Sequence, residues 1–144
     1  DYQRSRGLGD VYKRQKLAAP ERTVVSFHGD GGASMILPEL STAVENNINT
    51  VCVVMNNGTW GAEAAYQKDF FEGRYIGAHI TTPEFDKVAK LYGCNGIKVE
   101  KTAEIGDAIK AGIESECPTV IDVQCSPDAL YSFRQDSFKH KVKQ

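Results

Sequence analysis

Two stretches of sequence decide the fold: TVVSFHGDG at residues 23–31 and TVCVVMNNG at residues 50–58. Each begins as a short apolar run rich in β-branched residues, which is typical of a buried strand, and each ends in turn-forming residues. A segment with helical spacing lies between them. Successive strands of a parallel α/β sheet point the same way, so we expect both turns at one carboxyl edge, where such sheets bind ligands.

The rest of the chain continues this alternation of helices and strands. Apolar residues from Ile36 to Asn47 recur along one side of a helix. The later predicted elements are a short helix at 62–69, an irregular loop at 70–81, a helix that starts at 82–84 with Thr82 as its capping hydroxyl, a strand at 96–99, a helix capped by Thr102 and a strand at 119–123. Such alternation with short connections favours an α/β fold, a doubly wound parallel sheet with helices on both faces.

Length and composition bound the class of protein. The chain has 144 residues, of which 41% are hydrophobic and 25% are charged, with a net charge of -2. That is enough for one ordinary domain with a core, and the interspersed charges form no basic stripe for nucleic acid. No apolar run is long enough to span a membrane, and no export signal is recognised. Four cysteines without metal-binding spacing indicate reduced thiols, so we expect a cytoplasmic protein.

Residues 1–15 differ from the sequence that follows. They lack apolar periodicity, and GLGDVYKRQ at residues 7–15 resembles a translated adapter that recurs at the ends of gene models from metagenomes. We therefore set residues 1–15 apart as non-native and expect a chain cut short at its N-terminus, with a structured arm as the alternative. Residues 16–126 form the expected ligand-binding domain, and residues 127–144 form a polar tail.

The two turns carry the oxygen ligands that magnesium prefers. Asp30 offers a carboxylate, Asn57 an amide and Thr59 a backbone carbonyl, and Mg²⁺ commonly combines one or two carboxylates with substrate phosphates. A neutral amide suits a diphosphate, because a second acid would add repulsion. Several glycines leave room for the backbone to approach the phosphates: Gly29, Gly31, Gly32 and Gly58. The pattern predicts a metal that binds a diphosphate.

Each turn alone has an ordinary structural explanation. Gly-Asp-Gly and Asn-Asn-Gly are both common turn sequences. Their joint occurrence behind two apolar strands, separated by one helix and one strand, is far more specific for a ligand site.

The combination of GDG at residues 29–31 and NN at residues 56–57 closely resembles the signature of thiamine-diphosphate-dependent enzymes, in their pyrophosphate-binding domain. The resemblance runs from about Lys16 to the end of the chain. It implies the thiamine-diphosphate-binding fold, with thiamine diphosphate and Mg²⁺ as cofactors, and it makes Asp30, Asn57 and the Thr59 carbonyl the metal ligands. The cofactor-binding positions that it implies are Gly29, Asp30, Gly31, Gly32, Asn57, Thr59, Trp60 and Gly61.

Within that family, NNGTWGAE at residues 56–63 is similar to the sulfoacetaldehyde acetyltransferases, as are QKDFF at 67–71 and FRQD at 133–136. Acetolactate synthases usually lack the Trp-Gly-Ala-Glu element. The resemblance implies an acyltransferase of taurine and sulfonate metabolism, which converts sulfoacetaldehyde and phosphate into acetyl phosphate and sulfite.

Three residues are candidate substrate contacts under this interpretation. Trp60 can shape the pocket, Glu63 can hold the same loop, and the Arg134 guanidinium can bind a sulfonate or phosphate bidentately. Each also has a plain structural explanation. Packing explains Trp60, helix capping explains Glu63 and a surface salt bridge explains Arg134.

The resemblance also limits what the chain does alone. In this family the glutamate that activates the cofactor lies on a different, N-terminal domain, usually in the partner subunit, and no glutamate here matches it. The catalytic residues are therefore unknown. We expect a C-terminal fragment of a homodimer or higher oligomer that is inactive by itself.

Two other functions stay open. One is the small β subunit of a sulfopyruvate- or phosphonopyruvate-type decarboxylase, or another enzyme similar to acetolactate synthase. The other is a non-catalytic nucleotide- or phosphate-binding module. The sequence lacks the ribose-binding acid after the second strand that is typical of a dinucleotide-binding domain, which weighs against the latter.

Overall fold

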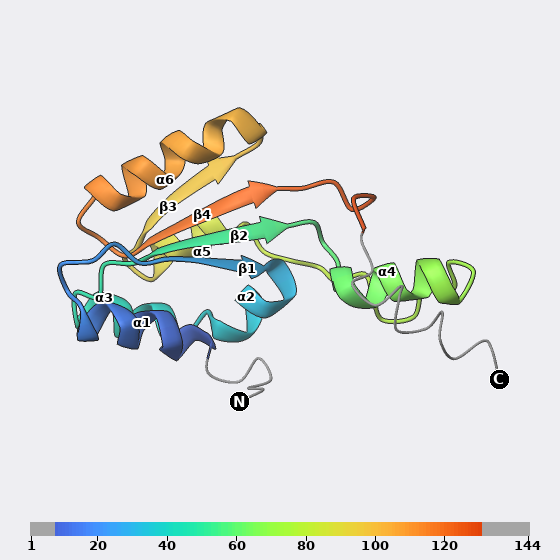
Figure 1. The fold of residues 1–144 in the computed structure, drawn as a ribbon, viewed down its shortest axis with the longest axis horizontal. Helices are drawn as coiled ribbons and strands as arrows, with labels where there is room; N and C mark the ends of the chain where they lie inside the picture. The colour runs from blue at the N-terminus through green and yellow to red at the C-terminus, as the bar shows by residue number, and fades with distance from the viewer. Residues whose placement is uncertain (1–7, 131–144) are drawn as a thin grey trace.

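The computed structural model describes residues 8–130 and has one parallel sheet between two layers of helices (Figure 1). Its strands are β1 (Val25–Gly29), β2 (Val51–Asn56), β3 (Asn95–Val99) and β4 (Thr119–Gln124). They are hydrogen-bonded in the order β1-β2-β4-β3, and each neighbouring pair is parallel. The prediction of a parallel α/β sheet is confirmed.

Helices connect the strands and cover both faces of the sheet. They are α1 (Leu8–Ala18), α2 (Asp30–Ile36), α3 (Glu39–Glu45), α4 (Gly61–Phe70), α5 (Phe85–Leu91) and α6 (Ile105–Glu114), with a 3-10 turn at Thr102–Glu104. In Figure 1, α6 lies on one side of the sheet and α1, α2 and α3 lie on the other. None of the helices in the described part of the chain is long and apolar enough to cross a membrane.

Strand β2 divides its residues between two core clusters. Val53 is fully buried in a cluster with Ala108 of α6. Val54, its neighbour, belongs to the opposite cluster with Leu40 of α3 and Phe85 of α5. Because both faces of this strand are covered, its sequence is a nearly continuous apolar run rather than an alternating one.

The helix expected across residues 36–47 is interrupted. Helix α2 ends at Ile36, and α3 begins directly after Pro38. Proline lacks the backbone N–H that would continue the α2 hydrogen bonds, and its fixed φ suits the start of a new helix. The apolar spacing still serves α3, whose Leu40 and Ala43 are buried.

The start of α5 also differs from the prediction. The Thr82 hydroxyl does not cap the helix but donates to Asn56 Oδ1 at 2.9 Å. The N–H of Phe85, the first residue of α5, instead donates to Asp122 Oδ2 at 2.9 Å. A buried carboxylate from β4 therefore caps this helix, an interaction between residues that are distant in sequence.

Helix α1 spans the boundary that we expected at residue 15. Tyr12 is buried, and its ring packs edge-on against His28 of β1, with the ring centroids 5.7 Å apart. Lys13 is also buried and forms an ion pair with Glu39 of α3. Residues 8–15 therefore pack on the domain as a structured arm would, and their origin as an adapter stays a prediction.

Candidate functional site

The carboxyl edge of the sheet brings the two turns together. Asp30 opens α2 directly after β1, and it is only 1% exposed. Its Oδ2 accepts a hydrogen bond of 2.6 Å from the N–H of Gly58, which lies in the turn after β2. Its Oδ1 accepts one of 2.9 Å from the Gly31 N–H. The turns after two neighbouring strands are thus in direct contact, the placement expected of parallel strands.

The turn after β2 is fixed by its own side chains. Asn57 Oδ1 accepts hydrogen bonds from the N–H of Thr59 at 3.0 Å and from its hydroxyl at 2.8 Å. Gly58 has a φ of +67°, a left-handed backbone conformation that residues other than glycine rarely adopt. A cation that uses Asn57 Oδ1 would have to replace at least one of the Thr59 hydrogen bonds.

Thr59 itself is buried, at 3% exposure, and forms an isolated antiparallel bridge with His79. The residues on either side of it also form hydrogen bonds with this segment: the Gly58 carbonyl accepts from the Ile80 N–H, and the Trp60 N–H donates to the Ala78 carbonyl. Among the hydrogen bonds described for residues 8–130, none has the Thr59 carbonyl oxygen as its acceptor. That oxygen is therefore not engaged in a hydrogen bond within the described residues.

The donor set at this edge fits magnesium. No group of three or more His, Cys, Asp or Glu residues that could hold a metal ion occurs within residues 8–130. A cation here would depend on one carboxylate, that of Asp30, together with the amide oxygen of Asn57 and the carbonyl oxygen of Thr59. This all-oxygen set, with positions left for phosphate oxygens, is what Mg²⁺ takes in phosphate-binding sites.

Trp60 packs on the first turn of α2. A Cβ added to Gly31 would lie 2.7 Å from Trp60 Cε3 and 2.8 Å from Cζ3. Space for the indole is therefore one reason for glycine at position 31, and the approach of its backbone to a phosphate stays a prediction. At Gly29 and Gly32 no neighbouring atom lies within 4 Å of a Cβ, so the backbone is open there.

The remaining candidate residues follow Trp60 in the sequence. Gly61 opens α4, and its Cβ position would be 3.7 Å from Asn57 Nδ2. In Figure 1, α4 extends beyond the carboxyl ends of the strands. Glu63, in the first turn of α4, is exposed to solvent. Arg134 lies outside the described residues, so its role as a substrate contact stays a prediction.

Two polar groups beside the turns are affected by burial. His28 is half-buried, and burial lowers the pKa of its imidazole. Its Nε2 lies 3.1 Å from Ser26 Oγ, and its ring packs against Tyr12 of α1. Burial raises the pKa of the Cys125 thiol, and the Asp30 carboxylate raises it further. Cys125 therefore lies within electrostatic reach of Asp30, a placement that the sequence did not indicate.

A buried polar network below the turn was also missed. Asn56 Nδ2 donates to Asp122 Oδ1 at 3.1 Å, and Asp122 is fully buried. Burial raises the pKa of the Asp122 carboxyl. The signal for this network is a charged residue inside an otherwise buried strand, TVIDV at residues 119–123.

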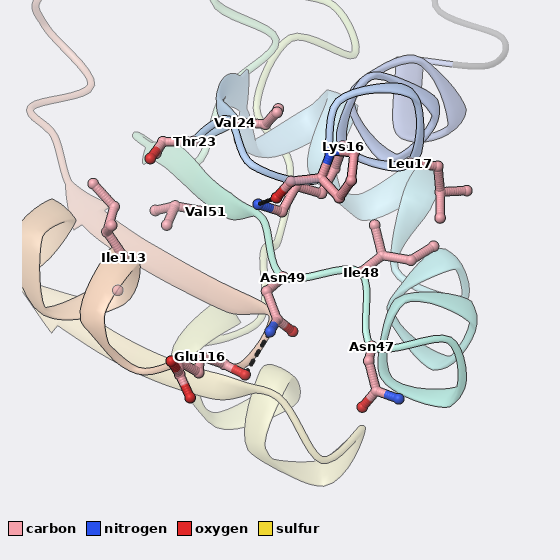
Figure 2. A pocket seen from close by; sticks show the side chains of 12 residues that line it. Lys16, Leu17, Thr23, Val24, Asn47, Ile48, Asn49, Val51, Ile113 and Glu116 are labelled. Atoms are coloured by element: carbon pink, nitrogen blue, oxygen red, sulfur yellow. Dashed lines mark hydrogen bonds between the residues drawn. The ribbon is translucent and has the colours of Figure 1, made fainter.

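A cavity of about 470 Å³ lies at the opposite edge of the sheet (Figure 2). It is lined by Thr23 and Val24 before β1, by Val51 at the start of β2, and by residues of α1 and α6. Figure 2 shows Asn49 Nδ2 donating to the Glu116 carbonyl at 2.6 Å on its wall. Because it lies at the amino ends of the strands, it is separate from the Asp30 and Asn57 turns.

Comparison with known proteins places the chain in a family. The family model described as thiamine pyrophosphate enzyme, C-terminal TPP binding domain, matches residues 14–123, where TPP is another name for thiamine diphosphate. A sulfoacetaldehyde acetyltransferase of Castellaniella defragrans is 33% identical over 132 residues, which cover 89% of this chain and 22% of that protein. A mitochondrial acetolactate synthase catalytic subunit of Aspergillus candidus is 34% identical over 108 residues, covering 75% of this chain and 16% of that protein.

A solved structure is similar as well. The thiamine diphosphate-dependent 4-hydroxybenzoylformate decarboxylase of Rhodococcus jostii RHA1 aligns with a TM-score of 0.76 and 30% identity, over 85% of this chain and 24% of that one. The chain thus spans less than a quarter of the length of each of these relatives.

Proposed function

The chain belongs to the family of C-terminal TPP-binding domains of thiamine pyrophosphate enzymes, and from that premise we propose that its carboxyl edge holds Mg²⁺ and the diphosphate of thiamine diphosphate. Asp30, the Asn57 amide and the Thr59 carbonyl would hold the cation. The Asp30–Gly58 hydrogen bond of 2.6 Å supports this most directly, because it joins the acidic turn to the amide turn.

The residues around this metal would orient the cofactor. Gly29 and Gly32 leave the backbone open towards the edge, and Trp60 fixes the turn against α2. When bound, thiamine diphosphate supplies the carbon chemistry, while the protein contributes binding, orientation and electrostatics. Asp30 and Thr59 are buried and Asn57 and Trp60 are half-buried, positions that would limit the access of water to the metal.

For the reaction, we propose the acyl transfer of a sulfoacetaldehyde acetyltransferase, from sulfoacetaldehyde and phosphate to acetyl phosphate and sulfite. Similarity alone does not choose among the relatives, since an acetyltransferase and an acetolactate synthase are 33% and 34% identical to the chain. The choice rests on NNGTWGAE at residues 56–63. Trp60, Glu63 and Arg134 are the proposed substrate contacts, Glu63 with the least support because it is exposed.

We propose that this domain acts within a homodimeric or larger cytoplasmic enzyme and is inactive alone. The chain covers 22% of the acetyltransferase that it matches, which supports a contribution from other domains. Turnover by the chain alone, with cofactor, Mg²⁺, phosphate and sulfoacetaldehyde, should give no acetyl phosphate. Substantial product would contradict the proposal that the site is incomplete.

Calorimetry tests the cofactor assignment without requiring activity. Thiamine diphosphate should bind in the presence of Mg²⁺ and not in EDTA. Asp30→Asn, which keeps the shape and removes the charge, should weaken Mg²⁺-dependent binding by at least about tenfold, since a carboxylate ligand is lost. The matched control is Asp107→Asn, an exposed carboxylate on α6, which should bind normally. Binding that is equal in Mg²⁺ and EDTA would reject the metal–diphosphate site.

A further inference from the structure

The segment 78–82 runs antiparallel along the turn 56–60 and bonds to every second residue of it. Three hydrogen bonds join them: from the Trp60 N–H to the Ala78 carbonyl at 2.7 Å, from the Ile80 N–H to the Gly58 carbonyl at 3.0 Å, and from the Thr82 hydroxyl to Asn56 Oδ1 at 2.9 Å. The isolated bridge between Thr59 and His79 has the same register. We call segment 78–82 the return clamp, because it brings the chain back from α4.

Asn56 connects the return clamp to the core. The residue is 8% exposed, and its Nδ2 donates to Asp122 Oδ1 at 3.1 Å. Its backbone carbonyl accepts the Cys125 N–H at 2.8 Å. Asp122 Oδ2 accepts the Phe85 N–H at 2.9 Å, so the same carboxylate holds the start of α5. The beginning of the turn is therefore held by the clamp, by Asp122 of β4 and by Cys125 just after β4, and the Asp122 carboxylate links it to the start of α5.

The amide and carbonyl oxygens that would hold the metal come next in the sequence. Asn57 follows Asn56, and Thr59 lies between the two residues whose backbone groups bond to the clamp. Magnesium requires near-octahedral geometry with short, well-defined distances, so small shifts of its ligands lower affinity. Groups behind a metal site that orient its ligands commonly have a large effect on metal affinity.

We propose that Thr82, acting through Asn56, is a positioning residue for the metal-binding turn, and that Asp122 is its buried anchor. This inference rests on the proposed function. The Thr82 hydroxyl donates to Asn56 and leaves the capping of α5 to Asp122. Thr82 therefore lies just before a helix, but its hydroxyl holds the turn after β2 instead of capping that helix.

The test compares three variants by their Mg²⁺ affinity. Thr82→Val removes the hydroxyl and keeps the shape, and Thr82→Ser keeps the hydroxyl. Thr119→Val removes a buried hydroxyl at the opposite edge, where it donates to the Cys117 carbonyl at 2.9 Å. Calorimetry with Mg²⁺ and thiamine diphosphate, on folded protein, should give a Kd for Mg²⁺ raised about three- to tenfold in Thr82→Val. Thr82→Ser and Thr119→Val should match the wild type.

The Mg²⁺ affinities of these variants either support or overturn the positioning role of Thr82. An unchanged Mg²⁺ affinity in folded Thr82→Val would overturn the positioning role, whatever its stability. Equal weakening in Thr119→Val would overturn it too, because the loss would then be a general effect of destabilisation. Should Thr82→Val not fold, Thr82→Ala removes the same hydrogen bond with a smaller side chain.

Failure of the proposed function gives a different result. In that case the wild type itself shows no Mg²⁺-dependent binding of thiamine diphosphate. Amide hydrogen exchange then tests whether Thr82 holds the return clamp on the turn. Thr82→Val should then speed exchange at Trp60 and Ile80, while Thr119→Val should not. Unaltered exchange at both amides in Thr82→Val would reject the clamp itself.

Discussion

Replacing Gly31 by alanine tests the contact between α2 and Trp60. The new Cβ would lie 2.7 Å from Trp60 Cε3 and 2.8 Å from Cζ3, well inside the 3.4 Å at which ordinary contacts begin. Overpacking of this kind costs about 1–3 kcal/mol, and alanine regains up to about 1 kcal/mol over glycine in a helix. We therefore expect the free energy of unfolding to fall by up to about 3 kcal/mol and the indole to move.

Gly32→Ala is the matched control, one position along the same helix. No neighbouring atom lies within 4 Å of its Cβ, so helix propensity alone acts and should stabilise by up to about 1 kcal/mol. Chemical denaturation followed by circular dichroism measures both free energies. Trp60 is the only tryptophan of the chain, so the emission spectrum reports the surroundings of its indole directly.

The two variants should therefore separate in both assays. Emission should shift in Gly31→Ala and stay as in the wild type in Gly32→Ala. Equal stabilities together with identical emission spectra would refute the packing of Trp60 on α2.

Three further predictions follow from packing and burial. Gly96→Ala should lower the free energy of unfolding by about 3 kcal/mol or more, because its Cβ would lie 2.0 Å from a backbone carbonyl oxygen of α5. The control Gly106→Ala places its Cβ in open space and should cause no such loss. Urea unfolding measures both free energies. Burial raises the pKa of Cys52 to about 12, so iodoacetamide near pH 8 should modify the less buried Cys117 long before Cys52. Peptide mass spectrometry gives the order of modification. Rapid modification of Cys52 would contradict its burial. Burial also raises the pKa of Asp122, so the folded state binds this proton more tightly than the unfolded state, and its contribution to stability falls as pH rises from about 4. The stability advantage of the wild type over Asp122→Asn should therefore shrink as pH rises above about 4, and an advantage that grows would show the opposite shift.

The parallel sheet and its carboxyl edge are predictable from sequence because their determinants are local. Apolar runs such as Val51 to Met55 indicate a strand covered on both faces, and Gly-Asp-Gly and Asn-Asn-Gly mark where two strands end. Parallel strands then place both turns at one edge without further information. The direct hydrogen bond between Asp30 and Gly58 follows from this arrangement. The roles of these residues towards metal and cofactor stay predictions.

The contacts that escape sequence analysis join distant residues. Thr82 carries a local signal for a helix cap, yet its hydroxyl bonds to Asn56, 26 positions away. The cap of α5 comes from Asp122, 37 positions from Phe85. The space beside Gly31 is filled by Trp60, a contact that the local Gly-Asp-Gly turn does not indicate. Each of these contacts depends on tertiary packing, which local sequence signals do not specify.

The position of a bound cation tests the central proposal most directly. Crystals of the chain grown with Mn²⁺ in place of Mg²⁺, and with thiamine diphosphate, would locate the cation by its anomalous scattering. We expect one peak within bonding distance of the Asp30 carboxylate, the Asn57 amide oxygen and the Thr59 carbonyl. Bound diphosphate with the peak elsewhere, or without a peak, would contradict the account.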